Sequence, residues 1–197
     1  MYSNKTTIDT IMKFAIFGNK HQTKKSESIG QLFNAITSRG DSFAIDKSFY
    51  DFLCKENIEV PTPQELITDN GFEADIAISF GGDGTLLRTA SRVGRKAIPV
   101  LGINAGRLGF LTATSNGNIE HVISRIHNGE YEIEERSLIE ATTNGVPLKS
   151  YPFALNEIAI MKHDSSSMIT LKAVLNGNDT ITYQADGLIV ATPSGST

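Results

Sequence analysis

A run of glycines around one carboxylate is the first segment of this sequence whose residue types and spacing could do chemistry. Gly81-Gly82-Asp83-Gly84-Thr85 follows an apolar run that ends at Phe80 and precedes Leu86, Ala90 and Val93 at helical spacing. Glycines let backbone amides come close to a phosphate, and the helix N-terminus adds a favourable dipole. A carboxylate in such a loop can accept the proton of an attacking hydroxyl or help to hold a metal ion. The loop therefore predicts a phosphoryl-transfer site with Asp83 as the catalytic residue and Gly81, Gly82, Gly84 and Thr85 as phosphate contacts.

Simpler explanations of this loop stay open at the level of sequence. Asp83 could cap the following helix, or Asp83-Gly84 could form an ordinary turn. The loop lacks the Gly-Lys-Ser/Thr of a Walker loop, and Leu87 stands where the dinucleotide-binding fingerprint has its last glycine. One turn into the helix, Arg88 is expected to face phosphates, although a solvated helix face would explain it equally well.

A second polar pair, Asn156-Glu157, interrupts the apolar stretch of residues 154–158. Asparagine both donates and accepts hydrogen bonds, and a glutamate can accept two hydroxyl protons, so the pair suits the diol of a ribose. Taken alone, an Asn-Glu dipeptide is more often a solvated turn.

The third candidate segment is residues 186–197, in which a polar turn enters a buried strand and leaves it into a loop of Pro, Gly, Ser and Thr. Hydroxyl groups and backbone amides gather in that loop, where they could bind ribose and phosphate oxygens. An ordinary hairpin end is the alternative explanation.

The elements that must position these residues fall into two groups. In the first, apolar runs predict strands over residues 13–18, 42–46, 75–80 and 97–103, alternating with helices over residues 26–38 and 49–55 and a short helical turn over residues 64–68. Strands that alternate with helices imply right-handed crossovers and a parallel sheet. We therefore expect a Rossmann-like α/β domain over residues 12–112, preceded by a flexible extension over residues 1–11.

The second group is mostly β. A helix is expected over residues 118–127, followed by strands over residues 131–143, 151–161, 168–175 and 188–191. Asn144-Gly145 and Asn176-Gly177 predict hairpin turns. We expect residues 113–197 to form a β-rich nucleotide-binding domain that is incomplete.

Composition narrows the class of protein. The chain has 197 residues and a formal net charge of -4, so no global field favours nucleic acid or an anionic membrane. One cysteine, Cys54, cannot form an internal disulfide, and no apolar run approaches the length of a membrane helix. These features indicate a cytoplasmic protein without nucleic-acid or membrane partners, and no metal site is expected from side chains alone.

The three motifs together resemble the NAD kinase family. Gly-Gly-Asp-Gly-Thr is shared by NAD kinases, diacylglycerol and sphingosine kinases and, more distantly, phosphofructokinases, whereas the Asn-Glu pair and the third segment resemble NAD kinases in particular. The likeness extends from Met12 to Thr197. In the family the third segment continues with Ala-Tyr, so we expect a family member that is truncated at its C-terminus.

The resemblance also implies contacts for individual residues. Phe110, within residues 102–111, would pack on a ring of the dinucleotide, although a core phenylalanine is the alternative. Many bacterial members have an arginine two residues before the aspartate of the third motif, where this chain has Gln184, which puts a charged contact there in doubt. The residues implied to bind NAD are Asn156, Glu157, Gln184, Asp186, Ser194, Gly195, Ser196 and Thr197.

The activity implied by the resemblance is transfer of the γ-phosphate of ATP to the 2′-hydroxyl of the adenosine ribose of NAD, which makes NADP. Mg2+ or another divalent ion would accompany ATP, and the protein would be a homo-oligomer. The alternatives are a lipid kinase of the diacylglycerol type and a non-catalytic NAD-binding fragment.

Overall fold

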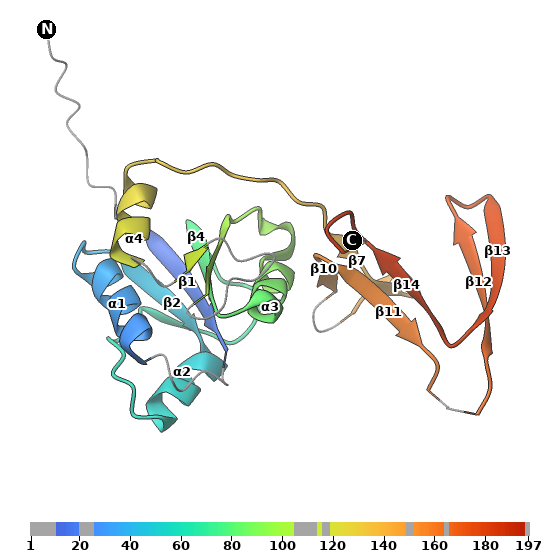
Figure 1. The fold of residues 1–197 in the computed structure, drawn as a ribbon, viewed down its shortest axis with the longest axis horizontal. Helices are drawn as coiled ribbons and strands as arrows, with labels where there is room; N and C mark the ends of the chain where they lie inside the picture. Colours follow the sequence, from blue (N-terminus) through green and yellow to red (C-terminus); the bar gives the residue numbers. More distant parts are fainter. Residues whose placement is uncertain are drawn as a thin grey trace, which may run out of the picture. The chain divides into compact units, whose positions relative to one another are not determined.

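A computed structural model describes residues 11–19, 26–104, 114–115, 119–148, 152–163 and 166–195, and the chain divides into two compact units. The first unit is Met1–Glu134 and the second is Glu135–Thr197 (Figure 1).

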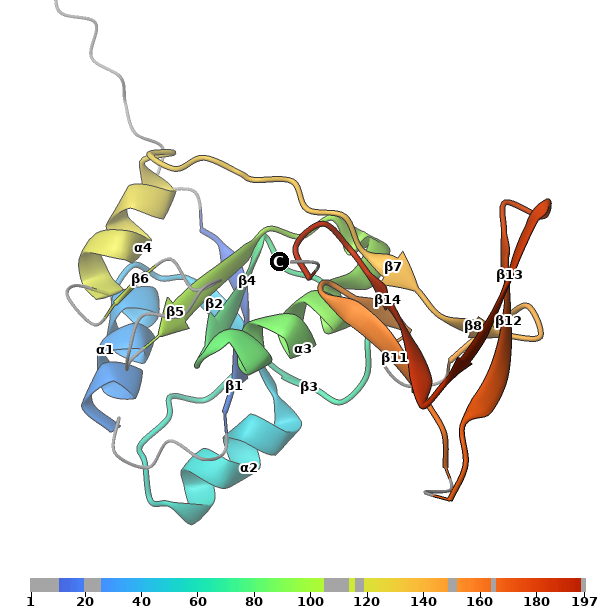
Figure 2. The same ribbon diagram turned by 45° about the vertical axis from the view of Figure 1, so that its right-hand side comes forward.

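A parallel sheet forms the centre of the first unit. Its strands, in spatial order, are β3 (Glu65–Ile67), β2 (Ser42–Asp46), β1 (Lys13–Gly18), β4 (Ile76–Phe80), β5 (Val100–Asn104) and β6 (Thr114–Ser115). Figure 2 shows the central strands of this sheet side by side. Because helices cover both faces, the central strands are continuous apolar runs, and all five residues of β4 are buried. The predicted Rossmann-like α/β class is confirmed.

The two faces of the sheet carry different side chains because successive residues of a strand point to opposite faces. One face, which carries Phe14 and Ile16 of β1, packs against α1 (Ser26–Thr37), α2 (Lys47–Lys55) and α4 (Ile119–His127). The other face carries Ala15, Ala44 and Ala77 and packs with Val93 of α3 (Asp83–Val93).

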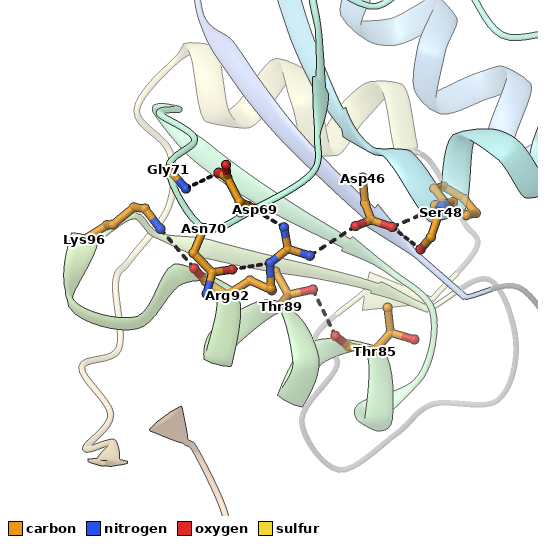
Figure 3. A network of polar contacts seen from close by, with 10 residues as sticks. Asp46, Ser48, Asp69, Asn70, Gly71, Thr85, Thr89, Arg92 and Lys96 are labelled. Carbon is orange, nitrogen blue, oxygen red and sulfur yellow. Dashed lines mark hydrogen bonds and ion pairs between the residues drawn. The ribbon is translucent and has the colours of Figure 1, made fainter. Parts of the chain in front are cut away.

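Arg92, in the last turn of α3, links that helix to the sheet and to the segment before β4 (Figure 3). Its Nη1 lies 3.2 Å from Oδ2 of Asp46, at the end of β2, while its other nitrogens donate to Oδ1 of Asn70 and the carbonyl oxygen of Asp69. Asp46 also caps α2, because its Oδ1 accepts a hydrogen bond of 3.0 Å from the backbone amide of Phe49. One guanidinium therefore joins three segments of the first unit.

Lys96 extends this cluster beyond the end of α3, in a short 3-10 helix (Gly94–Lys96). Its amino group donates to the carbonyl oxygen of Arg92 at 3.0 Å and lies 4.2 Å from the ring centre of Phe72. Burial, followed by repulsion from the charge of Arg92, lowers the pKa of Lys96 below its ordinary value.

The second unit is built of antiparallel pairs in the part of the chain that the structure describes. β7 (Ile139–Glu140) pairs with β10 (Phe153–Ala154), β8 (Thr142–Thr143) with β9 (Val146–Pro147), β11 (Glu157–Met161) with β14 (Gly187–Ala191), and β12 (Ile169–Leu175) with β13 (Asp179–Ala185). Both predicted hairpin turns are present, since Asn144, Gly145, Asn176 and Gly177 all have φ between 50° and 77°.

Two expectations differ from the structure. Residues 64–68 do not form a helical turn, because Glu65–Ile67 pairs as an edge strand with Ala44, Ile45 and Asp46 of β2. The continuous strand expected over residues 131–143 is reduced to the short strands β7 and β8.

The division between the two compact units falls after Glu134. Helix α4 belongs to the first unit because Ile119, Ile123 and Ile126 are buried in the core that also contains α1. In both Figure 1 and Figure 2, α4 lies beside α1. His127 at the end of α4 adds a hydrogen bond of 2.7 Å from its Nε2 to Oδ2 of Asp41, a side chain with no exposed surface.

Candidate functional site

The glycine loop connects the carboxyl end of β4 to the first turn of α3. The amide of Gly81 donates to the carbonyl oxygen of Ile103 in β5 at 2.9 Å, which ties the loop to the sheet. The carbonyl oxygen of Gly82 accepts hydrogen bonds from the amides of Thr85 and Leu86, at 2.8 and 3.2 Å, and so starts the helix. Gly82 is the N-cap residue and provides no side-chain cap, so the first amides of α3 point along the helix axis towards an anion-binding position.

The residues around Gly81 leave no room for a side chain. A Cβ atom at this position would lie 2.4 Å from Oγ1 of Thr85 and 3.3 Å from Cβ of Asn19. By contrast, a Cβ atom at Gly82 or Gly84 would meet no described atom within 4 Å. Packing within the described residues therefore requires a glycine at position 81, whereas it does not explain the glycines at positions 82 and 84.

Polar oxygens are buried beside this loop. The hydroxyls of Ser79 and Thr85 are buried and have no hydrogen-bond partner among the described residues. A buried hydroxyl without a partner carries a desolvation cost, and a bound polar group can remove that cost. Thr85 therefore has the properties of a residue that binds a ligand next to Gly81.

Asp83 occupies the first helical position of α3, one residue beyond the N-cap, and is half-buried. Its carboxylate is favoured there by the positive end of the helix dipole. The alternative in which Asp83 is the N-cap residue is wrong, because Gly82 has that position. Arg88 is further along the same helix, and its side chain is exposed.

Asn19 is a neighbour of the loop that the sequence analysis missed. It follows β1, whose last residue Gly18 pairs with Phe80 at the end of β4. In open parallel sheets, ligands bind beyond the carboxyl ends of the strands at the point where the strand order reverses. In this sheet the strand order reverses between β1 and β4, because the chain goes from β1 to β2 on one side of β1 while β4 lies on its other side. Asn19 follows β1 at this reversal, so the topology could have identified it.

The second unit brings Asn156 and Glu157 together with Ser194 and Gly195. Thr192 connects the segment that contains Ser194 to the segment that contains Asn156. Its amide donates to the carbonyl oxygen of Asn156 at 2.8 Å, and its hydroxyl donates to the carbonyl oxygen of Leu155. A Cβ atom at Gly195 would lie 2.3 Å from the carbonyl oxygen of Asn156, so this turn can approach only because residue 195 is a glycine.

The Asn156 side chain has an acceptor available for a ligand. Its Oδ1 is buried and has no hydrogen-bond partner among the described residues, whereas the neighbouring Glu157 is exposed. A buried amide oxygen next to an accessible carboxylate can accept two hydrogen bonds from a pair of vicinal hydroxyls.

Gln184 and Asp186 lie elsewhere in this unit. β11 and β14 are antiparallel, with Glu157 opposite Ala191 at one end and Met161 opposite Gly187 at the other. Asp186 precedes Gly187 and lies opposite Lys162, so six residue steps, about 20 Å along the pair, separate it from Asn156. There it forms an ion pair of 2.6 Å with Lys162, which the sequence analysis also missed, and Gln184 is exposed on β13.

Three predicted contacts, Phe110, Ser196 and Thr197, lie outside the described residues. Within the described ranges, no group of three or more His, Cys, Asp or Glu side chains could hold a metal ion. No helix in those ranges is both long enough and apolar enough to cross a membrane.

A parallel sheet with a glycine-rich loop at its carboxyl edge, followed by an antiparallel β unit, defines an α/β protein whose loop has the geometry suited to phosphate. The chain belongs to the ATP-NAD kinase family: the model of the family's N-terminal domain matches residues 15–131, and that of its C-terminal domain matches residues 155–197.

Individual relatives agree with this assignment. The chain is 48% identical over 189 residues to an NAD kinase of Bacteroides fragilis and 43% identical over 185 residues to an NAD kinase of Porphyromonas gingivalis. Each match covers 94% of this chain and 64% of the relative, so the chain spans less than two thirds of the length of these relatives. A crystal structure of yeast NADH kinase complexed with NADH has the same fold, with a TM-score of 0.73 at 20% identity, over 95% of this chain and 59% of that one.

Proposed function

We propose that this protein is an NAD kinase, which transfers the γ-phosphate of ATP to the 2′-hydroxyl of the adenosine ribose of NAD. The observation that carries the proposal is the carboxylate of Asp83, set at the start of a helix in a glycine loop that suits phosphate. A carboxylate repels phosphate, so its place in an anion-binding loop is explained by a role in the transfer itself.

In the first unit, the loop amides and the Thr85 hydroxyl would bind phosphate oxygens of the donor. Glycines at positions 82 and 84 leave the space that a phosphate needs for a close approach to the backbone. Arg88, exposed on α3, would contribute charge to the same phosphates.

Asp83 would accept a hydrogen bond from the attacking 2′-hydroxyl and orient it. In a loose phosphoryl-transfer transition state, bond formation to the nucleophile is slight, so positioning contributes more than early proton removal. The proton would pass to Asp83 late in the transfer.

Mg2+ fits this site as an ion that arrives with the nucleotide. It usually binds through one or two carboxylates together with substrate phosphates, and Asp83 provides one half-buried carboxylate beside the loop. When bound, the ion would neutralise developing negative charge on the phosphates.

In the second unit, Asn156 and Glu157 would bind ribose hydroxyls, and Ser194, Gly195, Ser196 and Thr197 would contact the nucleotide. We assign Asp186 and Gln184 to a different part of the dinucleotide, because Asp186 lies at the other end of the β11–β14 pair from Asn156 and Gln184 lies on β13. Phe110 would pack on a ring of the dinucleotide. We also propose that the protein is located in the cytoplasm and forms a homo-oligomer.

The test is NADP formation from NAD, ATP and Mg2+, measured with an NADP-dependent dehydrogenase. The full-length protein and its Asp83→Asn variant are assayed together. We expect activity in the full-length protein and a loss of about 10²–10⁴-fold in Asp83→Asn. A full-length protein that phosphorylates diacylglycerol and not NAD would overturn the proposal, and NAD binding without NADP formation would indicate a non-catalytic binding protein.

A further inference from the structure

Arg136 contacts the turn that the proposed function assigns to the nucleotide. Its Nη1 donates a hydrogen bond of 3.3 Å to Oγ of Ser194, across 58 residues of sequence. No motif of the sequence includes Arg136, which lies three residues before β7.

The strand pairing brings Arg136 to the same end of the unit as Asn156. β7 and β10 are antiparallel, with Ile139 opposite Ala154. The chain that precedes β7 therefore runs alongside the chain that follows β10, which contains Asn156. Arg136 and Asn156 thus approach the Thr192–Gly195 turn from two adjacent segments, one at Ser194 and the other at Thr192 and Gly195.

The chemistry of this hydrogen bond fixes the role of the Ser194 hydroxyl. A guanidinium has donors and no acceptor, so Ser194 Oγ must be the acceptor in this contact. The hydroxyl proton then points away from Arg136 and can be donated to another group. Phosphate and ribose oxygens accept such a proton, and a nearby positive charge polarises the hydroxyl and makes it a better donor.

We propose that Arg136 is a positioning residue for the dinucleotide, holding the Ser194 hydroxyl as a donor towards a phosphate or ribose oxygen of NAD. This inference rests on the proposed function, because it assigns the ligand of Ser194 to the same nucleotide. It adds a residue, and a direction for one hydrogen bond, to the nucleotide site of the second unit.

The test measures NAD affinity by calorimetry in the full-length protein and four variants: Arg136→Met, Arg136→Lys, Ser194→Ala and the double variant Arg136→Met/Ser194→Ala. Lys172→Met is the control, because it removes one positive charge from an exposed position of β12 in the same unit. Thermal unfolding of each variant identifies any that do not fold. If Arg136→Met does not fold, Arg136→Lys replaces it, because lysine keeps the positive charge but lacks the planar guanidinium.

We expect Arg136→Met and Ser194→Ala each to weaken NAD binding about tenfold. The double variant should bind about as weakly as either single variant, since both changes remove the same interaction. Arg136→Lys should lose about threefold to tenfold, and Lys172→Met should bind as the unaltered protein does. Normal affinity in Arg136→Met, or losses that multiply in the double variant, would overturn the inference and leave the proposed function standing. An unaltered protein that does not bind NAD would overturn both.

Discussion

Arg92 and Asp46 form an ion pair of 3.2 Å between the last turn of α3 and the end of β2, with only 11% and 14% of their side chains exposed. Since α3 begins at the glycine loop, this pair sets how the helix that carries Asp83 lies against the sheet. The same guanidinium also holds the segment before β4 through Asp69 and Asn70.

Arg92→Met should therefore lower the free energy of unfolding by about 3 kcal/mol, because it leaves the buried carboxylate of Asp46 without its charged partner. Urea unfolding measures the loss. Lys47→Met is the control: it breaks an ion pair to Asp51 whose side chains are more than half exposed, and it should cost less than about 1 kcal/mol. Equal losses in both variants would show that the burial of the Arg92 pair has no energetic consequence.

Gly82→Ala should separate binding from folding in the glycine loop. The backbone of Gly82, with φ of -83° and ψ of -173°, suits an alanine, and no described atom lies within 4 Å of the added Cβ. We expect a stability loss of no more than about 1 kcal/mol, from the poorer N-cap. The KM for ATP should rise about tenfold or more, because the methyl group occupies the space proposed for a phosphate.

Steady-state kinetics and thermal unfolding check this prediction. Gly30→Ala is the matched control, since its Cβ also meets nothing within 4 Å but lies inside α1, where alanine should stabilise by about 0.5–1 kcal/mol. An unchanged KM for ATP in Gly82→Ala would contradict the phosphate assignment of this glycine.

Gly195→Ala should disturb the nucleotide turn of the second unit. The added Cβ would lie 2.3–2.8 Å from three backbone atoms of Asn156, which cannot rotate aside. We expect a stability loss of about 1–3 kcal/mol and NAD binding at least tenfold weaker, measured by thermal unfolding and calorimetry. Asn178→Ala, on the exposed turn between β12 and β13, should leave NAD affinity unchanged. Normal NAD affinity in Gly195→Ala would exclude the turn from the binding site.

His127→Ala tests the assignment of α4 to the first unit. The variant removes the partner of Oδ2 of Asp41, whose other oxygen accepts a hydrogen bond from the amide of Met12. Loss of a partner from a buried carboxylate should cost about 2 kcal/mol in urea unfolding. Arg125→Ala on the same helix, with its exposed 3.8 Å contact to Glu130, should cost less than about 1 kcal/mol. If both variants unfold alike, the Asp41 contact does not anchor α4.

Sequence patterns predicted the elements whose own residues are sufficient to indicate their structure. Strands β1 and β4 are buried on both faces and read as apolar runs, and the glycines that follow β4 mark the loop. The edge strand β3 was assigned as a helical turn because its three residues form a strand only through pairing with β2. The same holds for residues 131–143, of which only β7 and β8 find a partner among the described residues.

Contacts between distant segments could not be predicted in the same way. Arg136 and Lys162 are ordinary charged residues in the sequence, and their partners Ser194 and Asp186 are 58 and 24 residues away. Asn19 gains its position only once β1 and β4 lie side by side. The motifs identified the loops, whereas the side chains that orient those loops depend on the pairing of strands.

The alanines on the α3 face of the sheet limit how this protein can vary. Ala15, Ala44 and Ala77 are fully buried in one cluster. Because the interior is closely packed, no space is left beside them for a larger side chain. A larger residue at any of them would have to displace side chains that pack on the same face, such as Phe17, Phe72 and Val93. Substitution by a larger residue is therefore restricted at these three positions, even though Phe17 and Phe72 on the same face are large.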